Sequence, residues 1–276
     1  GSVVCILLIF FTKLVITKKL SDTFSKAWNT RCGMITAWGF VYLYEILLML
    51  VLSFGNHLTQ LFLWILFAAT GTGIFIVCSF WTKKWFLVCS ERAVEGENDS
   101  VLIKNEYERK TEKMIIALLV IIIGFWMFRS FVYFDTTWDA LVYEMPRIFQ
   151  FSTGKSLFIN QDAIAKNIFV NEWNGELNAI FYRILTGDNI SISFGNAETL
   201  FYGMLAFYEL GKAWLKNNRF ILALTFISMP VNIFLSFTVK SDLLGCICLP
   251  VFLLMLFLYW RTSREGETDD ILLVGC

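Results

Sequence analysis

Histidine and proline are nearly missing from this sequence, which has one histidine and three prolines in 276 residues. Its seven cysteines form no Cys-x-x-Cys pair and lack the spacing to a histidine that zinc sites use. We therefore expect no zinc site and interpret the cysteines as small buried hydrophobic residues. Lys and Arg number 23, as do Asp and Glu, so no net basic charge is present to attract nucleic acid.

Nucleotide-binding motifs and convincing internal repeats are also missing. The glycines Gly71 and Gly73 lie inside an apolar run, where small residues let helices approach each other, and they do not resemble a phosphate loop. What the chain has in excess is apolar surface, with 57% hydrophobic and 17% aromatic residues. This composition exceeds that of an ordinary globular domain and predicts an all-α, polytopic membrane protein.

About seven apolar runs approach or reach the length of about 17 to 25 residues that a membrane-spanning helix needs. The predicted spans are Val3–Thr17 (short), Met34–Phe54, Leu61–Trp81, Met114–Phe134, Ala197–Leu215, Phe220–Val239 and Leu243–Trp260. Pro230 and Pro250 are placed near span ends. The final residues, ILLVGC, are expected to begin a further helix, so the chain is interpreted as a fragment of a longer protein.

Lys and Arg cluster after the first, third, fifth and seventh spans, which places these connections together on the cytoplasmic side. The connection at residues 135–196 is then external, and at about sixty residues its length is typical of a functional loop. Apolar spacing within it predicts amphipathic helices at the membrane surface. We divide the chain into residues 1–113, with N-terminal helices and a cytoplasmic loop, a core at 114–260, and a cytoplasmic turn at 261–276.

Ionisable residues gather where the fourth span meets the external loop. Asp139, Tyr143 and Arg147 recur at four-residue spacing, which places them on one helix face. Asp135 and Asp139 could equally cap a helix at its positive end. Arg129 lies about one turn inside its span, where it either serves a function or extends to the lipid headgroups.

A second group of charges lies in the turn before the last span, where Lys240 and Asp242 separate two apolar runs. This turn and the long loop share the external face in the predicted topology. A cation there could neutralise a lipid-linked phosphate, and a carboxylate could act as general base toward a hydroxyl.

The stretch DALVYEMPR, at Asp139–Arg147, resembles the pattern D-x-x-x-Y-H-x-P-R that follows the first span in many bacterial GT-C membrane glycosyltransferases. The resemblance is to the branch that includes protein O-mannosyltransferases and aminoarabinose transferases. Glu144 stands where that pattern has histidine. Glu176 in NGELNAIF matches the Glu of a later element whose prolines are missing here, and SDLL at 241–244 is similar to a T/S-D-L motif that opens a span.

This resemblance covers roughly residues 114–260 and implies an inverting transfer of a sugar from a polyprenyl-phosphate donor to an external acceptor. It implies Asp139 as catalytic base, with Asp135 as the second choice. The substrate-binding residues that we assign on this basis are Tyr143, Glu144, Arg147, Glu176, Lys240, Asp242 and Arg129. We predict no cofactor and no obligatory metal, and the plasma membrane as the location.

Two other interpretations remain open. A membrane transporter would place Arg129, Glu198 and Glu209 on a permeation path, and it should show repeats or broken spans. A non-catalytic assembly subunit would leave Asp139 replaceable. The sugar and the acceptor cannot be read from these residues.

Overall fold

The protein is helical throughout the part of the chain that the structure describes. The computed structural model describes residues 2–27, 33–90, 106–133, 135–158, 176–215, 220–236, 238–239 and 242–264. Within those ranges, the helices at Gly33–Phe54, Gln60–Phe80 and Lys110–Val132 are long and apolar enough to cross a membrane. Their outward faces carry exposed apolar side chains, such as Val51 and Val120. These features indicate a membrane protein.

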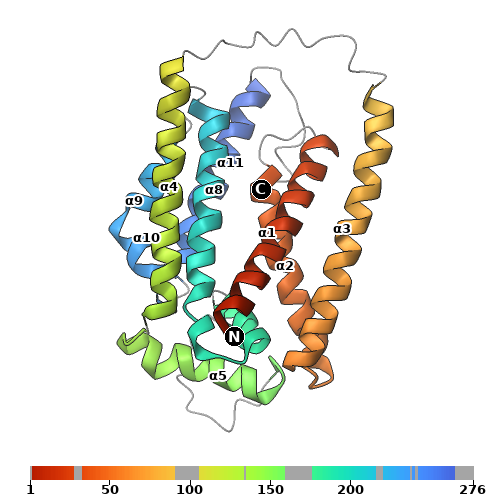
Figure 1. Ribbon diagram of the computed structural model, residues 1–276, viewed down its shortest axis with the longest axis vertical. Coiled ribbons are helices and arrows are strands. Elements are labelled where there is room, and N and C mark those ends of the chain that lie inside the picture. Colours follow the sequence, from red (N-terminus) through yellow and green to blue (C-terminus); the bar gives the residue numbers. More distant parts are fainter. Residues whose placement is uncertain are drawn as a thin grey trace.

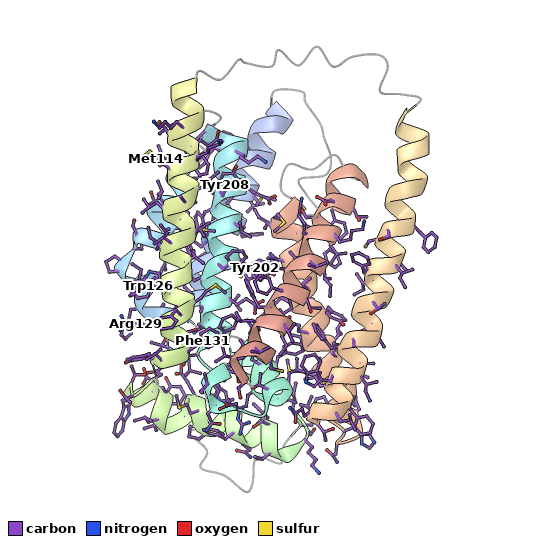
Figure 2. The ribbon with its side chains drawn as sticks, viewed as in Figure 1. Met114, Trp126, Arg129, Phe131, Tyr202 and Tyr208 are labelled. Carbon is purple, nitrogen blue, oxygen red and sulfur yellow. The ribbon has the colours of Figure 1, made fainter. Side chains whose placement is uncertain are left out.

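Six long helices stand side by side in the molecule (Figure 1). They are α1 (Ser2–Ala27), α2 (Gly33–Phe54), α3 (Gln60–Ser90), α4 (Glu106–Val132), α8 (Phe194–Leu215) and α11 (Asp242–Arg264). From α1 to α8 the long helices alternate in direction, so that Met114 near the start of α4 lies at the same end as Tyr208 near the end of α8 (Figure 2). α11 runs in the same direction as α8, because α9 and α10 return the chain between them (Figure 1). α1 and α4 both extend beyond the predicted spans, and the predicted division after residue 113 falls inside α4.

One end of the bundle is closed by short helices, and we call it the α5 end (Figure 1). It carries the π-helix η1 (Ala140–Glu144), α5 (Met145–Gly154), α7 (Leu177–Thr186) and the 3₁₀ helix η4 (Asn189–Ser191). The apolar spacing of α7 predicted an amphipathic helix with one face exposed at the membrane surface. The structure differs from that prediction. Eight of its residues are buried, including Asn178 and Tyr182. α7 therefore belongs to the core.

The prediction of one continuous helix over Phe220–Val239 is wrong, because the chain breaks there into α9 (Phe220–Ser228) and α10 (Pro230–Leu235). Pro230 has no N–H to donate, and it forces Met229 into an extended conformation (φ −65°, ψ 120°). The carbonyl of Phe226 would have accepted that missing N–H, and the side-chain amide of Asn232 donates to it instead at 2.8 Å. Pro250 likewise lies inside α11, away from the predicted helix end.

Two glycines on α8 permit close helix crossings. A Cβ at Gly195 would lie 3.0 Å from the backbone nitrogen of Ala179 in α7. A Cβ at Gly203 would lie 2.6 Å from the Ile247 side chain of α11. α8 is thereby brought against both α7 and the last helix, in the manner of small-residue contacts between membrane helices.

Candidate functional site

Asp135 joins the beginning of the acidic motif to the turn before α11. Its side chain is fully buried, and Oδ1 accepts a hydrogen bond from the backbone N–H of Thr137 at 2.9 Å. Oδ2 accepts one from the backbone N–H of Val239, also at 2.9 Å. The first bond is a local Asx turn, whereas the second spans 104 positions in the chain. Two segments predicted to share a site are therefore in direct contact.

Asp139 lies at the N-terminus of the π-helix η1 and is half-buried. Its side chain makes no cap hydrogen bond to this helix, so the helix-cap interpretation is wrong for η1. The π-helix continues directly into α5 at Met145. Single π-turns inside helices occur frequently at functional sites, because the wider turn redirects the side chains that follow.

Arg147 forms a buried ion pair with Glu176 in the loop that leads to α7. One guanidinium nitrogen, Nη1, donates to both carboxylate oxygens, at 3.1 and 2.9 Å. The exposed fractions of these side chains are 0% and 1%, so neither reaches solvent. The Arg147 guanidinium also lies 5.8 Å from the centre of the Tyr143 ring. The structure therefore brings together three of the predicted residues, in contact with one another.

Glu144 adds a second carboxyl group to this cluster, which then contains two acidic groups and one basic group. It is buried, and its carboxylate acts electrostatically on Glu176. Burial raises the pKa of Glu176 to about 8, although Arg147 lowers it, and Glu144 raises it further. A second buried carboxyl group near the Arg147–Glu176 pair thus favours a proton on Glu176 at neutral pH.

The remaining predicted residues are less closely connected. Arg129 is half-buried near the α5 end of α4 (Figure 2), and its guanidinium lies 5.5 Å from the Trp126 ring and 5.4 Å from the Tyr133 ring. Asp242 is exposed as the first residue of α11. Lys240 lies outside the described residues, so its predicted role stays a prediction.

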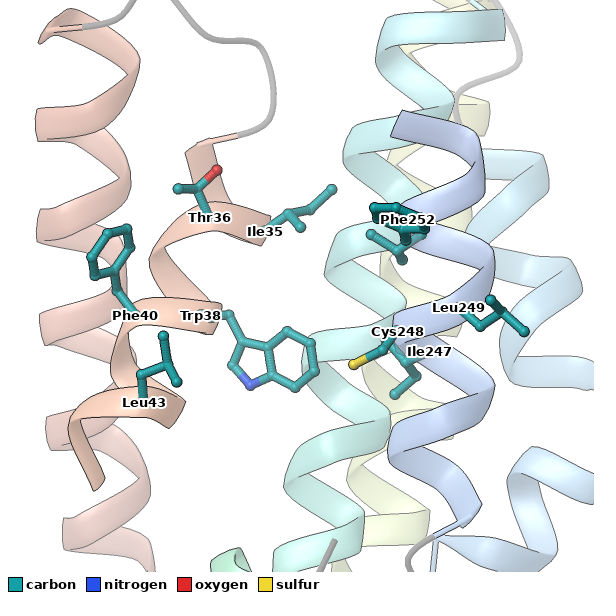
Figure 3. A pocket seen from close by; sticks show the side chains of 11 residues that line it. Ile35, Thr36, Trp38, Phe40, Leu43, Ile247, Cys248, Leu249 and Phe252 are labelled. Atoms are coloured by element: carbon teal, nitrogen blue, oxygen red, sulfur yellow. The ribbon is translucent and has the colours of Figure 1, made fainter. Parts of the chain in front are cut away.

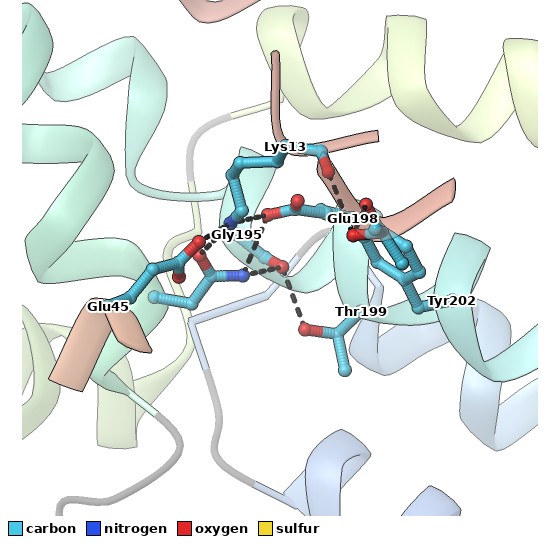
Figure 4. Close-up of polar contacts among 8 residues, drawn as sticks. Lys13, Glu45, Gly195, Glu198, Thr199 and Tyr202 are labelled. Atoms are coloured by element: carbon cyan, nitrogen blue, oxygen red, sulfur yellow. Dashed lines mark hydrogen bonds and ion pairs between the residues drawn. The ribbon is translucent and has the colours of Figure 1, made fainter. Parts of the chain in front are cut away.

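A second buried polar cluster joins α1, α2, α7 and α8, and only its Glu198 was named from the sequence, for the transporter interpretation (Figure 4). Lys13 of α1 lies 2.6 Å from a carboxylate oxygen of Glu45 in α2 and 2.6 Å from one of Glu198 in α8. Asn178 of α7 accepts from Lys13 at 3.2 Å and donates to Glu198 at 3.0 Å. The available signal was the charge itself, since ionisable residues inside apolar runs are rare and usually paired.

An apolar groove of about 660 Å³ separates α2 from α11. Trp38 extends from α2 toward Cys248 on α11 (Figure 3), and Phe40, Leu43 and Phe252 contribute to the walls. The lining is hydrocarbon and aromatic, apart from Thr36 and Cys248. Such a groove is suited to a lipid chain and offers little to a polar ligand.

Among the residues that the structure describes, no three His, Cys, Asp or Glu side chains are grouped to hold a metal ion. Comparison of the chain with protein-family models, curated proteins and solved structures finds no match. The chemistry of this protein is therefore argued from its own residues.

Proposed function

We propose that this protein is a membrane glycosyltransferase that moves a sugar from a polyprenyl-phosphate donor to an extracytoplasmic acceptor. The proposal begins with the resemblance of Asp139–Arg147 to the GT-C motif. It places the α5 end outside, at the surface of the plasma membrane, and treats all seven apolar runs as parts of the membrane domain, with α9 and α10 forming one broken segment.

The observation that carries the proposal is the convergence of segments that the resemblance had assigned to one site. Asp135 contacts the turn at Val239, and Arg147 contacts Glu176, across 104 and 29 positions of the chain. Both contacts are buried and lie in segments at the α5 end. A solvent-exposed loop would not need two buried, charged contacts between distant segments, because water can satisfy its polar groups.

In the proposed reaction, the Asp139 carboxylate takes the proton of an acceptor hydroxyl. The hydroxyl oxygen forms a bond to the anomeric carbon of the sugar while the bond to the phosphate oxygen breaks. The polyprenyl phosphate leaves with the electron pair, and the anomeric configuration inverts. Asp139 is preferred for this role because the resemblance places it at the position of the base and it is half-buried, and both Asp135 oxygens already accept hydrogen bonds from backbone N–H groups.

The other residues support the reaction in different ways. Arg147 is fully buried and forms an ion pair with Glu176. We therefore assign it the role of positioning the η1–α5 segment. This role replaces the predicted contact with phosphate. Phosphate charge would be met by Arg129 and Lys240, and Asp242 would contact the sugar. The apolar groove between α2 and α11 would hold part of the isoprenoid chain.

The test is sugar transfer in membranes that contain the full protein, supplied with a panel of labelled polyprenyl-phosphate sugars. An Asp139→Asn variant should lose about 100-fold to 10,000-fold of the rate, which is typical when a general base is removed. Asp22→Asn is the matched control, because Asp22 pairs with Lys18 on the exposed surface of α1. Transfer that survives in Asp139→Asn, or the absence of transfer from every donor, overturns the proposal.

A transporter is the second candidate, and two observations favour it. The Lys13–Glu45–Glu198 cluster lies inside the helical bundle, and Pro230 breaks a hydrophobic segment as in many transporters. Reconstituted vesicles distinguish the two candidates. A transporter moves solute across a sealed vesicle without chemical change, whereas the enzyme forms a new glycosidic bond.

A further inference from the structure

The cluster formed by Lys13, Glu45 and Glu198 plays no part in the proposed transfer reaction. Its members come from three helices, α1, α2 and α8, and their exposed side-chain fractions are 3%, 2% and 1%. One ammonium group thus lies between two carboxyl groups in a space closed to solvent (Figure 4). If all three groups were ionised, the cluster would carry one uncompensated negative charge.

Nearby cations do not supply the missing positive charge. Lys18 pairs with Asp22, and Lys19 lies over the Phe75 ring. Arg183 of α7 lies over the Phe149 ring, and the described segment 60–80 of α3 contains no charged residue. The other described polar side chains that contact the cluster or interact with it electrostatically are uncharged at neutral pH: Thr17, Tyr42, Tyr44, Asn178, Tyr182 and Tyr202.

A lone negative charge buried in this way costs several kcal/mol, and proteins usually avoid the cost by binding a proton. The hydrogen bonds indicate which carboxyl group binds it. Oε2 of Glu198 accepts from both Lys13 and Asn178, which favours the ionised form. Oε1 of Glu45 lies 2.6 Å from the Lys13 nitrogen, as Glu198 Oε2 does, but no second donor such as Asn178 reaches either Glu45 oxygen among the described residues.

We propose that the Lys13–Glu45–Glu198 cluster is a proton-binding site that holds one proton on Glu45 at neutral pH. The bound proton leaves the Lys13 ammonium and the Glu198 carboxylate as a balanced pair. α1, α2 and α8 are thereby held together by a neutral set of side chains. Loss of the proton introduces a net negative charge among these three helices and weakens their packing.

Infrared spectroscopy of the full protein in lipid nanodiscs tests the site, because a protonated carboxyl group has its own carbonyl stretching band. At pH 7, Glu45→Gln should remove the intensity of one protonated carboxyl group per protein. Glu198→Gln should remove the same intensity, since Glu45 then ionises to balance Lys13. Lys13→Met should add one protonated carboxyl group, because Glu198 loses its cation. Glu112→Gln is the control. Glu112 lies on α4 toward the end opposite the α5 end, so its replacement should leave this band unchanged.

Identical bands in the wild type and Glu45→Gln would overturn the proposal, as would an unchanged band in Lys13→Met. If Glu45→Gln does not fold, Glu45→Asp keeps a carboxyl group, and its band should shift in frequency without losing intensity. A band unmoved by Glu45→Asp also refutes the site. None of these infrared measurements depends on sugar transfer, so the proton-site proposal and the glycosyltransferase proposal can be refuted independently.

Discussion

Replacing either partner of the Arg147–Glu176 pair should destabilise the α5 end strongly. Arg147→Met leaves Glu176 without its cation, and Glu176→Gln leaves a buried guanidinium whose partner can no longer ionise. Both side chains are almost completely excluded from solvent, and Nη1 bridges both carboxylate oxygens. Breaking a buried ion pair of this kind costs about 3–5 kcal/mol, a loss expected in full above about pH 8, where Glu176 is ionised.

Denaturant titration of the purified protein in detergent, followed by tryptophan fluorescence, gives the free energy of unfolding for each variant. The double variant Arg147→Met, Glu176→Gln should cost less than the sum of the two single variants. A coupling energy of about 2 kcal/mol is expected for residues in direct contact. Asp22→Asn should change the free energy by less than about 1 kcal/mol, since exposed ion pairs contribute little.

The same pair should make stability depend on pH. The pKa of Glu176 is raised from 4.5 to about 8, so the folded protein binds this proton more tightly than the unfolded chain does. The stability that this bound proton contributes is fully present below about pH 4.5, and it is lost as the pH rises to about 8 and above. The wild type should therefore lose more stability than Glu176→Gln across that window. Equal slopes in the two proteins, or single variants that cost less than about 1 kcal/mol, would refute the assignment of a buried pair.

Two further predictions concern contacts between distant segments. Asp135→Asn should lower the free energy of unfolding by about 1–3 kcal/mol. The amide N–H₂ would face one of the two backbone N–H groups that now donate to the carboxylate. A loss of sugar transfer without any loss of stability would instead make Asp135 the base. Gly195→Ala should cost about 1–3 kcal/mol, since the new methyl group meets the α7 backbone, which cannot move aside. Gly124→Ala, whose Cβ meets nothing within 4 Å, is its control, and equal stabilities in the two glycine variants would show that the crossing is looser than described.

Local patterns in the sequence predicted most of the helices, but they did not predict which ionisable side chains pair with each other. Long apolar runs become helices because the backbone must satisfy its own hydrogen bonds in a bilayer, and the Lys and Arg clusters predict their directions. The Pro230 break was missed because the segment around it is uncharged and mostly apolar. Its cause lies in one absent N–H and in Asn232, which replaces that hydrogen bond.

The candidate site shows the same limit. Spacing and resemblance selected Asp139, Arg147 and Glu176, yet they could not show that Arg147 is fully buried against Glu176. Pairing over 29 positions depends on where α7 packs, and α7 was expected at the surface. The Lys13 cluster was missed for a related reason, since it forms only when α8, which begins far along the chain, brings Glu198 against α1 and α2.

The different distances along the chain from Lys13 to its two partners have a consequence for biosynthesis. In the proposed topology a ribosome delivers α1 before α2 and α8, and a lysine in the middle of α1 is unfavourable in lipid until a carboxylate arrives. Glu45 arrives with α2, so Lys13 can enter the lipid already paired. Glu198 is made more than 150 residues after Glu45, and its arrival changes Glu45 from the counter-ion of Lys13 into a neutral acid. Assembly of the bundle is then expected to take up a proton at the step when α8 docks.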